Sequence, residues 1–212
     1  MATDLIEIDI DNPYPGAIDR AVHEVARGHV VGVPTDALYA LVADPLNLQA
    51  VGRVFAAKGR ESVRSLPLGI SDVLMAEDLA KELNSRFYIL ARHFWPGPLT
   101  MIVPAAANVP LKVTGNTGRL AIRQASCPIL NAIIDKTGHA LIATSANISG
   151  QPTVSSGIEL FAQMDGRVDL VLDGGVCTGP GPTTVDITEP YWRVIKEGAI
   201  SEKEIADRLQ AN

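Results

Sequence analysis

The segment at residues 143–150 combines small side chains with the hydroxyl and amide groups that ligand contact requires. It reads Ala-Thr-Ser-Ala-Asn-Ile-Ser-Gly and follows the apolar run at residues 139–142, which predicts a buried strand. Ser145 and Asn147 offer donors and acceptors on short stems, and small neighbours let a ligand approach the backbone. Ligands often bind at strand ends in α/β sheets. An ordinary Asx or Ser turn before the next helix would explain the same residues.

Two further polar segments stand directly after predicted elements. Thr35 and Asp36 follow a short apolar strand at 30–33, where they could hold a small polar ligand or simply cap a helical turn. Lys58 and Arg60 flank Gly59 at the end of a predicted helix. The glycine permits an abrupt turn, so both cations can point at one polyphosphate. Favourable placement of cations at a helix C-terminus is the alternative explanation.

A fourth segment, residues 119–123, has the alternation of a strand. Arg119, Ala121 and Arg123 share one face, and Leu120 and Ile122 point to the other. Two arginines on one face could bind a carboxylate or phosphate in a bidentate manner, or they could lie at a solvated edge.

These segments need a scaffold of alternating helices and strands. The apolar spacing predicts helices at 17–27, 48–58, 76–83, 86–94 and 129–136, and one that opens with a capping box at 201–204. It predicts strands at 30–33, 66–70, 99–103, 120–123, 139–142, 168–172, 184–187 and 192–196. This order predicts an α/β or α+β fold in a single domain over residues 1–212. The irregular stretch 173–182 holds four glycines and two prolines and is either a functional loop or an edge excursion.

Composition restricts the class of partner. The formal net charge of −6 weighs against a protein that coats nucleic acid, but it allows a local basic pocket for a small anion. The cations in or beside the polar segments are Lys58, Arg60, Arg64, Arg119, Arg123, Arg193 and Lys196.

Two cysteines without metal-ligand spacing indicate a reducing compartment. No apolar run approaches the length of a membrane span and no signal peptide is evident, so we expect a cytoplasmic protein without a membrane partner.

The order of the segments is more specific than any one of them. From about Gly16 to Ile200 the chain resembles the YrdC/TsaC family, the threonylcarbamoyl-AMP synthases of tRNA modification, in a short single-domain form. The matching segments, in order, are Pro34-Thr35-Asp36, Lys58-Gly59-Arg60, Trp95-Pro96-Gly97-Pro98-Leu99-Thr100, Ala121-Ile122-Arg123, Ser145-Ala146-Asn147 and Lys196-Glu197-Gly198-Ala199-Ile200.

The resemblance implies a twisted mixed sheet, flanked by helices, around a concave basic cavity. It implies that L-threonine, bicarbonate and ATP are joined into threonylcarbamoyl-AMP, with release of pyrophosphate. Mg²⁺ would be carried by the ATP phosphates, with no metal-ligand residues in the protein. The product would serve the threonylcarbamoyl-transferase machinery that modifies adenosine 37 of tRNA.

The resemblance also implies roles for individual residues. Lys58 and Arg60 would be the catalytic groups. The residues implied for ATP binding are Lys58, Arg60, Arg64, Ser145, Asn147, Thr153 and Lys196. Those implied for threonine binding are Thr35, Arg123 and Thr183, with Arg123 on the carboxylate.

The chain also departs from the family pattern. Gly69, Pro182 and Lys196 stand where many members carry histidine, serine and arginine, and Arg64-Ser65 replaces a run of lysine or asparagine followed by proline. Tyr39-Ala40-Leu41 and Pro182-Thr183-Thr184 are similar to YciO-type paralogues.

Three alternative functions therefore stay open. One is a YciO-like protein with another substrate. The second is an RNA-binding or ribosome-associated protein that contacts RNA or tRNA through the cavity. The third, a carbamoyl-adenylate module of hydrogenase maturation, is disfavoured because no CxxC motif occurs.

Overall fold

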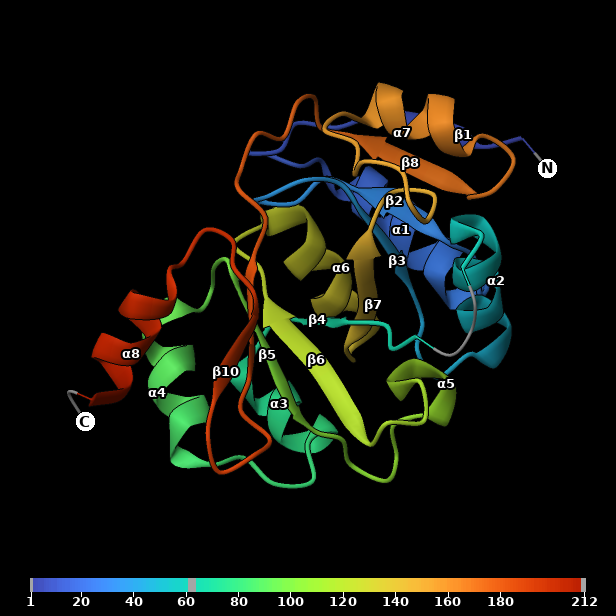
Figure 1. The fold of residues 1–212 in the computed structure, drawn as a ribbon. Helices are drawn as coiled ribbons and strands as arrows, with labels where there is room; N and C mark the ends of the chain where they lie inside the picture. Colours follow the sequence, from blue (N-terminus) through green and yellow to red (C-terminus); the bar gives the residue numbers. More distant parts are fainter. Residues whose placement is uncertain (1, 61–63, 211–212) are drawn as a thin grey trace.

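A single mixed sheet forms the centre of the computed structural model, which describes residues 2–60 and 64–210 (Figure 1). In this described part of the chain the sheet has ten strands in the order β1-β8-β2-β3-β7-β4-β6-β5-β9-β10. The strands are β1 Asp4–Glu7, β2 Val31–Val33, β3 Ala40–Ala43, β4 Leu68–Ile70, β5 Leu99–Pro104, β6 Arg119–Gln124, β7 Leu141–Ser145, β8 Leu170–Asp173, β9 Thr183–Asp186 and β10 Arg193–Lys196. Parallel and antiparallel pairs are mixed, which confirms the predicted fold class.

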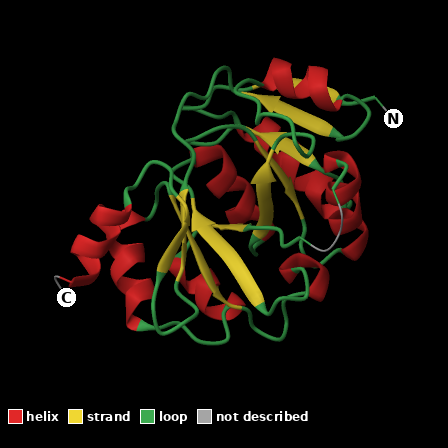
Figure 2. Ribbon diagram, in the orientation of Figure 1, coloured by secondary structure: helices red, strands yellow, loops and turns green. Residues whose placement is uncertain are grey.

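Helices lie on both sides of this sheet (Figure 2). They are α1 Pro15–Ala26, α2 Leu48–Lys58, α3 Val73–Leu79, α4 Ser85–Phe94, α5 Leu111–Thr114, α6 Pro128–Thr137, α7 Gly157–Met164 and α8 Glu202–Gln210. Helix α2 has the predicted bounds, and α8 has the predicted capping box, in which Glu204 N–H donates to Ser201 Oγ at 3.3 Å. No helix in the two described ranges is long and apolar enough to cross a membrane.

The two faces of the sheet bury different clusters of apolar side chains. Helices α1 and α6 pack together over one face, where they cover Val31, Leu141 and Leu170. The opposite face carries Ile142 and Val171 against the larger cluster that includes residues of α2, α4 and α7. Among the described residues, the cluster beneath α1 and α6 takes no side chain from β5, β6 or β9. On the sheet face that α1 and α6 cover elsewhere, these three strands are therefore not part of the apolar cluster.

Four elements were absent from the sequence-based prediction: β1, β3, α5 and α7. Strand β3 shows why. All four of its residues are buried, so it has no alternating pattern, and it follows directly after the polar segment that was interpreted as a possible ligand motif. Helix α7 begins at a regular cap, Ser156, whose side chain accepts from Glu159 N–H.

The glycine-rich loop 173–182 packs against the turn that contains Asp36. A Cβ atom on Gly179 would lie 2.0 Å from the Asp36 carbonyl oxygen and 2.9 Å from Ala37 Cα. Both atoms belong to the backbone, so no side-chain movement could relieve the clash. Glycine is required here by close approach of two chain segments.

We therefore expect Gly179→Ala to lower the free energy of unfolding by about 1–3 kcal/mol, the usual cost of overpacking. The control is Gly52→Ala in α2, where a Cβ meets nothing within 4 Å. That change should stabilise the helix by about 0.5–1 kcal/mol. Urea denaturation of both variants measures their free energies of unfolding. Equal values would contradict the expectation and show that the loop can move to accommodate the added methyl group.

Candidate active site

A cavity of about 340 Å³ lies on the sheet face that α1 and α6 leave partly uncovered. Its wall contains residues of β3, β4, β6, β7, β9 and β10 together with connecting loops. Six of the residues implied by the sequence line it: Thr35, Arg60, Arg123, Ser145, Thr153 and Lys196. These residues come from widely separated parts of the chain and converge on one hollow.

Strand register places several lining residues in a row across the sheet. Gly69 of β4 pairs with Arg123 of β6, and Thr100 of β5 pairs with Thr184 of β9. Thr184 in turn pairs with Lys196 of β10. All five line the cavity. The β9–β10 register shifts between Val194 and Lys196, and a shift of this kind redirects the side chain that follows it.

Thr183 does not reach the cavity, although the resemblance implied a substrate contact for it. It is fully buried; its hydroxyl donates to Ile200 O at 2.6 Å and accepts from the N–H groups of Gly198 and Ile200. Successive side chains of a strand point to opposite faces, so Thr184 faces the cavity in its place. Thr100 is a second lining hydroxyl that the sequence analysis did not assign.

Lys58 lies beneath the cavity wall, with only 2% of its surface exposed. Its ammonium donates to the backbone oxygens of Ser145 and Asn147, the latter at 3.2 Å, and to Asn147 Oδ1 at 3.3 Å and Ser145 Oγ at 3.4 Å. Burial, and then the charge of Arg60, lower its pKa from 10.5 to about 8. Lys58 therefore fastens the end of α2 to the end of β7.

The Ser145–Asn147 turn is further fixed by its own side chains. Ser145 Oγ lies 2.6 Å from Asn147 Oδ1, and Asn147 Nδ2 donates to Gln151 O at 2.7 Å. Ser145 lines the cavity, whereas Asn147 is not among the residues of its wall. The segment is thus a braced turn at a strand end, and its contact with a ligand stays a prediction.

Arg60 enters the cavity with donors to spare. Its Nη2 donates to Ser65 O at 3.3 Å, and its buried Nε has no hydrogen-bond partner among the described residues. Burial, followed by the charge of Arg64, lowers the pKa of Arg60. Arg64 itself is exposed and does not line the cavity. A buried guanidinium nitrogen without an acceptor is suited to receive an anion.

Arg123 and Thr35 also line the cavity. Arg123 Nε donates to Gly97 O at 2.9 Å, and its Nη2 lies 2.7 Å from both carboxylate oxygens of Asp36. The Thr35 hydroxyl donates to Leu38 O at 2.5 Å and accepts from Ala37 N–H, but no helix starts there, so Thr35 braces a turn and does not cap a helix. Arg119, on the same face of β6, is held outside the cavity by Asp186 and Glu189.

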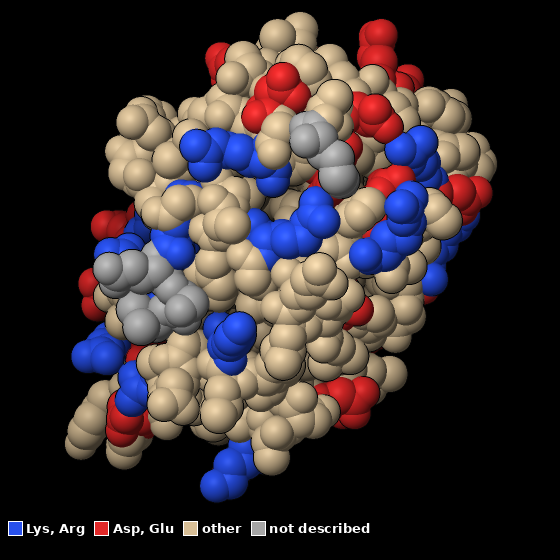
Figure 3. Space-filling view, turned by 90° about the vertical axis from the view of Figure 1, so that its right-hand side faces the viewer, with Lys and Arg blue, Asp and Glu red and all other residues tan. Residues whose placement is uncertain are grey.

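The charge distribution suits a small anion better than a polymer. Figure 3 shows Lys and Arg side chains across the middle of the face on the α2 side, with Asp and Glu mostly toward its margins. The side chain of Lys196, at the cavity rim, has neither an ion pair nor a hydrogen bond to any residue in the described ranges. Unpaired cations in a hollow attract anionic substrates and lower the cost of bringing phosphates together.

The donor set does not form a cage for a resident metal ion. Within residues 2–60 and 64–210, no group of three or more His, Cys, Asp or Glu side chains could hold one. Asp36, beside the cavity, already accepts from Arg123 and from Ser126 N–H. Mg²⁺ carried by the phosphates of a nucleotide stays a prediction.

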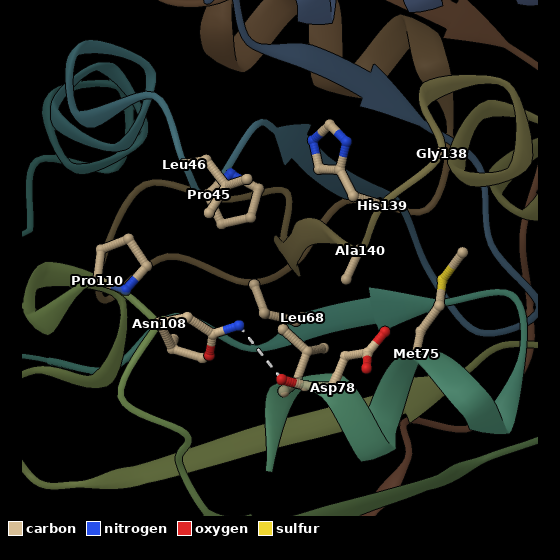
Figure 4. A pocket seen from close by; sticks show the side chains of 12 residues that line it. Pro45, Leu46, Leu68, Met75, Asp78, Asn108, Pro110, Gly138, His139 and Ala140 are labelled. Atoms are coloured by element: carbon tan, nitrogen blue, oxygen red, sulfur yellow. Dashed lines mark hydrogen bonds between the residues drawn. The ribbon is translucent and has the colours of Figure 1, made fainter. Parts of the chain in front are cut away.

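A second cavity of about 180 Å³ lies between α3 and the loop before β7 (Figure 4). Its lining is mainly apolar, with Leu46, Leu68 and Met75 on its walls, and Asn108 Nδ2 donates to Asp78 O at 3.3 Å beside it. None of the residues assigned from the sequence lines it. The chemistry of the chain is therefore concentrated in the first cavity.

Comparison with known proteins agrees with this arrangement. Residues 23–198 match the model of the Sua5/YciO/YrdC family, whose description is "Telomere recombination". The threonylcarbamoyl-AMP synthase of Pyrococcus abyssi is 34% identical over 85% of this chain and 54% of its own length. That of Xanthomonas campestris is 34% identical over 82% of this chain and 94% of its own length. The chain thus spans only about half of some curated relatives and nearly all of others.

Solved structures extend the likeness to three dimensions. P. abyssi Sua5 complexed with L-threonine superposes with a TM-score of 0.93 and 32% identity over 98% of this chain and 61% of that one. E. coli YciO gives a TM-score of 0.88 and 25% identity over 96% of this chain and 99% of that one. The resemblance seen in the sequence is confirmed: this chain belongs to the Sua5/YciO/YrdC family.

Proposed function

We propose that the protein is an L-threonylcarbamoyladenylate synthase, which joins L-threonine, bicarbonate and ATP and releases pyrophosphate. The observation that carries the proposal is the convergence of Arg60, Arg123 and Lys196 on one cavity. Relatives that share about a third of its residues bear this enzyme's name, and one related structure is a complex with L-threonine.

The nucleotide phosphates are expected on the side of Arg60. Its Nε has no partner among the described residues, and Ser145 offers a hydroxyl nearby on the same wall. Lys196, across the cavity on β10, would add a point charge, and Thr153 a further hydroxyl. Arg64, exposed just outside, is left with a supporting electrostatic role.

Lys58 would act on the nucleotide through the turn that it holds. Its four acceptors belong to Ser145 and Asn147, so the ammonium fixes the segment that would contact the phosphates. Its lowered pKa follows from the same burial. We therefore assign Lys58 and Asn147 to positioning and Arg60 to direct contact.

The amino acid is expected beside Arg123, whose strand β6 lies between β7, which carries Ser145, and β10, which carries Lys196. A guanidinium suits a carboxylate, and Thr184 and Thr35 lie on the same wall. Gly69, which pairs with Arg123, lies in a crowded place: a Cβ there would lie 3.1 Å from Ala143 Cβ, so a larger residue would require this neighbour to shift. Gly69 and Ala143 therefore form a part of the cavity wall near Arg123 that has only small side chains.

The chemistry requires positioning and charge stabilisation. The nitrogen of the threonine amino group first forms a bond to the carbon of bicarbonate, and water leaves, which gives a carbamate. A carbamate oxygen then attacks the α-phosphorus of ATP, the bond to the β-phosphate oxygen breaks, and pyrophosphate leaves with its electron pair. Cations that gather mutually repelling anions and stabilise the leaving group supply the catalysis. Mg²⁺ would enter with ATP, and the product would go to the machinery that modifies tRNA.

A YciO-like activity on another substrate is the second candidate. The YciO structure matches over nearly its whole length, and this chain carries Gly69 where many family members carry a histidine. Mass spectrometry of reactions with Mg-ATP, bicarbonate and a panel of amino acids separates the two. Formation of threonylcarbamoyl-AMP and pyrophosphate with threonine supports the synthase. ATP binding with no adenylate from threonine contradicts it and favours the second candidate.

Arg60→Met should raise the dissociation constant for Mg-ATP by about ten- to a hundredfold, because a charge-assisted bond to phosphate is lost. Its melting temperature should stay near that of the wild type, since the Arg60 side chain makes one hydrogen bond to the described residues. Lys58→Met should lose both affinity and stability. Arg119→Met, which removes a cation held outside the cavity, is the control for charge alone. Calorimetric titration and thermal melts measure both properties, and full ATP affinity in Arg60→Met would exclude it from the phosphate site.

A paired substitution of the two adjacent threonines tests the register. Thr184→Val should raise the KM for threonine with little change in melting temperature, because its side chain faces the cavity. Thr183→Val should lower the melting temperature, because three hydrogen bonds of a buried hydroxyl are lost. Substrate kinetics and thermal melts are compared for both variants. The reverse pattern would mean that Thr183 turns to the substrate.

A further inference from the structure

We propose that Asp36 is a positioning residue of the amino-acid site: its carboxylate orients the Arg123 guanidinium so that Nη1 can bind the carboxylate of the substrate. The inference rests on the proposed function for the identity of the substrate. It concerns a residue for which the sequence offered a ligand contact or a helix cap but no role toward Arg123, and which does not itself line the cavity.

Two acceptors fix the guanidinium along one edge. Gly97 O accepts from Nε at 2.9 Å, and both Asp36 oxygens lie 2.7 Å from Nη2. No hydrogen bond joins Nη1 to any other residue in the described ranges. Since Arg123 lines the cavity, Nη1 is the donor that its two partners leave available there. A planar guanidinium held on one edge presents the remaining edge in a defined direction.

Asp36 is itself held independently of Arg123. Ser126 N–H donates to its Oδ2 at 3.2 Å, just before α6 begins at Pro128. Gly179 of the glycine-rich loop touches its backbone from another side. The carboxylate therefore ties the turn after β2 to the loop after β6. This anchoring favours a fixed support over a side chain that would swing away when substrate enters.

The ion pair between Arg123 and Asp36 is largely shielded from solvent. The Arg123 and Asp36 side chains are 14% and 16% exposed. Burial lowers the pKa of Arg123, and the charge of Asp36 and its hydrogen bonds act in the opposite direction. Without Asp36 a nearly buried cation would lose its counter-ion and one of its two supports, and it would be free to turn.

The central variant is Asp36→Asn, which keeps the shape but removes the charge and offers a donor where an acceptor was needed. Asp36→Glu keeps the charge. The matched control is Asp186→Asn: Asp186 is also buried and also pairs with an arginine of β6, Arg119, but outside the cavity. It therefore reports the general cost of breaking such a pair.

We expect Asp36→Asn to raise the KM for threonine about tenfold or more, the loss usual for a charge-assisted contact, with the ATP dissociation constant within about twofold of the wild type. Asp36→Glu should have a KM for threonine between those of the wild type and Asp36→Asn. Asp186→Asn should melt at a temperature similar to that of Asp36→Asn but keep the wild-type KM for threonine and dissociation constant for ATP. An unchanged KM overturns the proposal. A lower KM overturns it as well, because Asp36 would then compete with the substrate. If the dissociation constant for ATP rose by the same factor as the KM for threonine, the substitution would have disturbed the whole cavity, and the proposal would be overturned.

A second measurement keeps this inference separate from the proposed function. The Nε–H resonance of Arg123, identified by its loss in Arg123→Lys, should exchange slowly with solvent in the full-length wild-type protein. Fast exchange of this signal in Asp36→Asn, but not in Asp186→Asn, supports the positioning role even if no amino acid proves to be a substrate. A signal unchanged by Asp36→Asn overturns it. Absence of product in the wild type contradicts only the proposed function.

Discussion

The register of five strands determines where the polar groups that the sheet contributes to the cavity point. Pairing of Gly69 with Arg123 and of Thr100 with Thr184 puts these residues in one row, and the shift between Val194 and Lys196 brings Lys196 into it. A slip of one residue in any strand would exchange the cavity face for the apolar face. Tight apolar packing on that second face, by Met101, Leu120 and Val185 among others, therefore fixes the geometry of the polar one.

Buried and exposed cations are used differently in this protein. Lys58 and Arg123 are largely buried, and each is surrounded by acceptors that offset its desolvation. Arg60 keeps a buried nitrogen without a partner among the described residues, and Lys196 lies exposed at the rim. Lys58 fixes two chain segments, and the acceptors of Arg123 hold its guanidinium in one plane with Nη1 left available. Arg60 and Lys196 keep donors that have no partner among the described residues. This division explains how an acidic protein can present a basic cavity.

Much of this arrangement was predictable from local patterns, and the rest depended on distant contacts. Apolar spacing predicted α2 with its bounds, and the alternation in residues 119–123 predicted the face of Arg123. Which of two adjacent threonines faces the cavity follows from strand pairing, so Thr183 was assigned in place of Thr184. The acceptors of Lys58 lie 87 and 89 residues away and two of the four are backbone oxygens, and Asp36 lies 87 residues from Arg123, so neither contact leaves a pattern in the sequence. Strand β3, buried on both faces, lacked an alternation to detect.

The most direct test of the account is a crystal structure with L-threonine and a non-hydrolysable ATP analogue. The account predicts the threonine carboxylate on Arg123 Nη1 and the triphosphate at Arg60 and Lys196, with the Lys58 ammonium still bound to the Ser145–Asn147 turn. Threonine bound away from Arg123, or a triphosphate that makes no contact with Arg60, would contradict it.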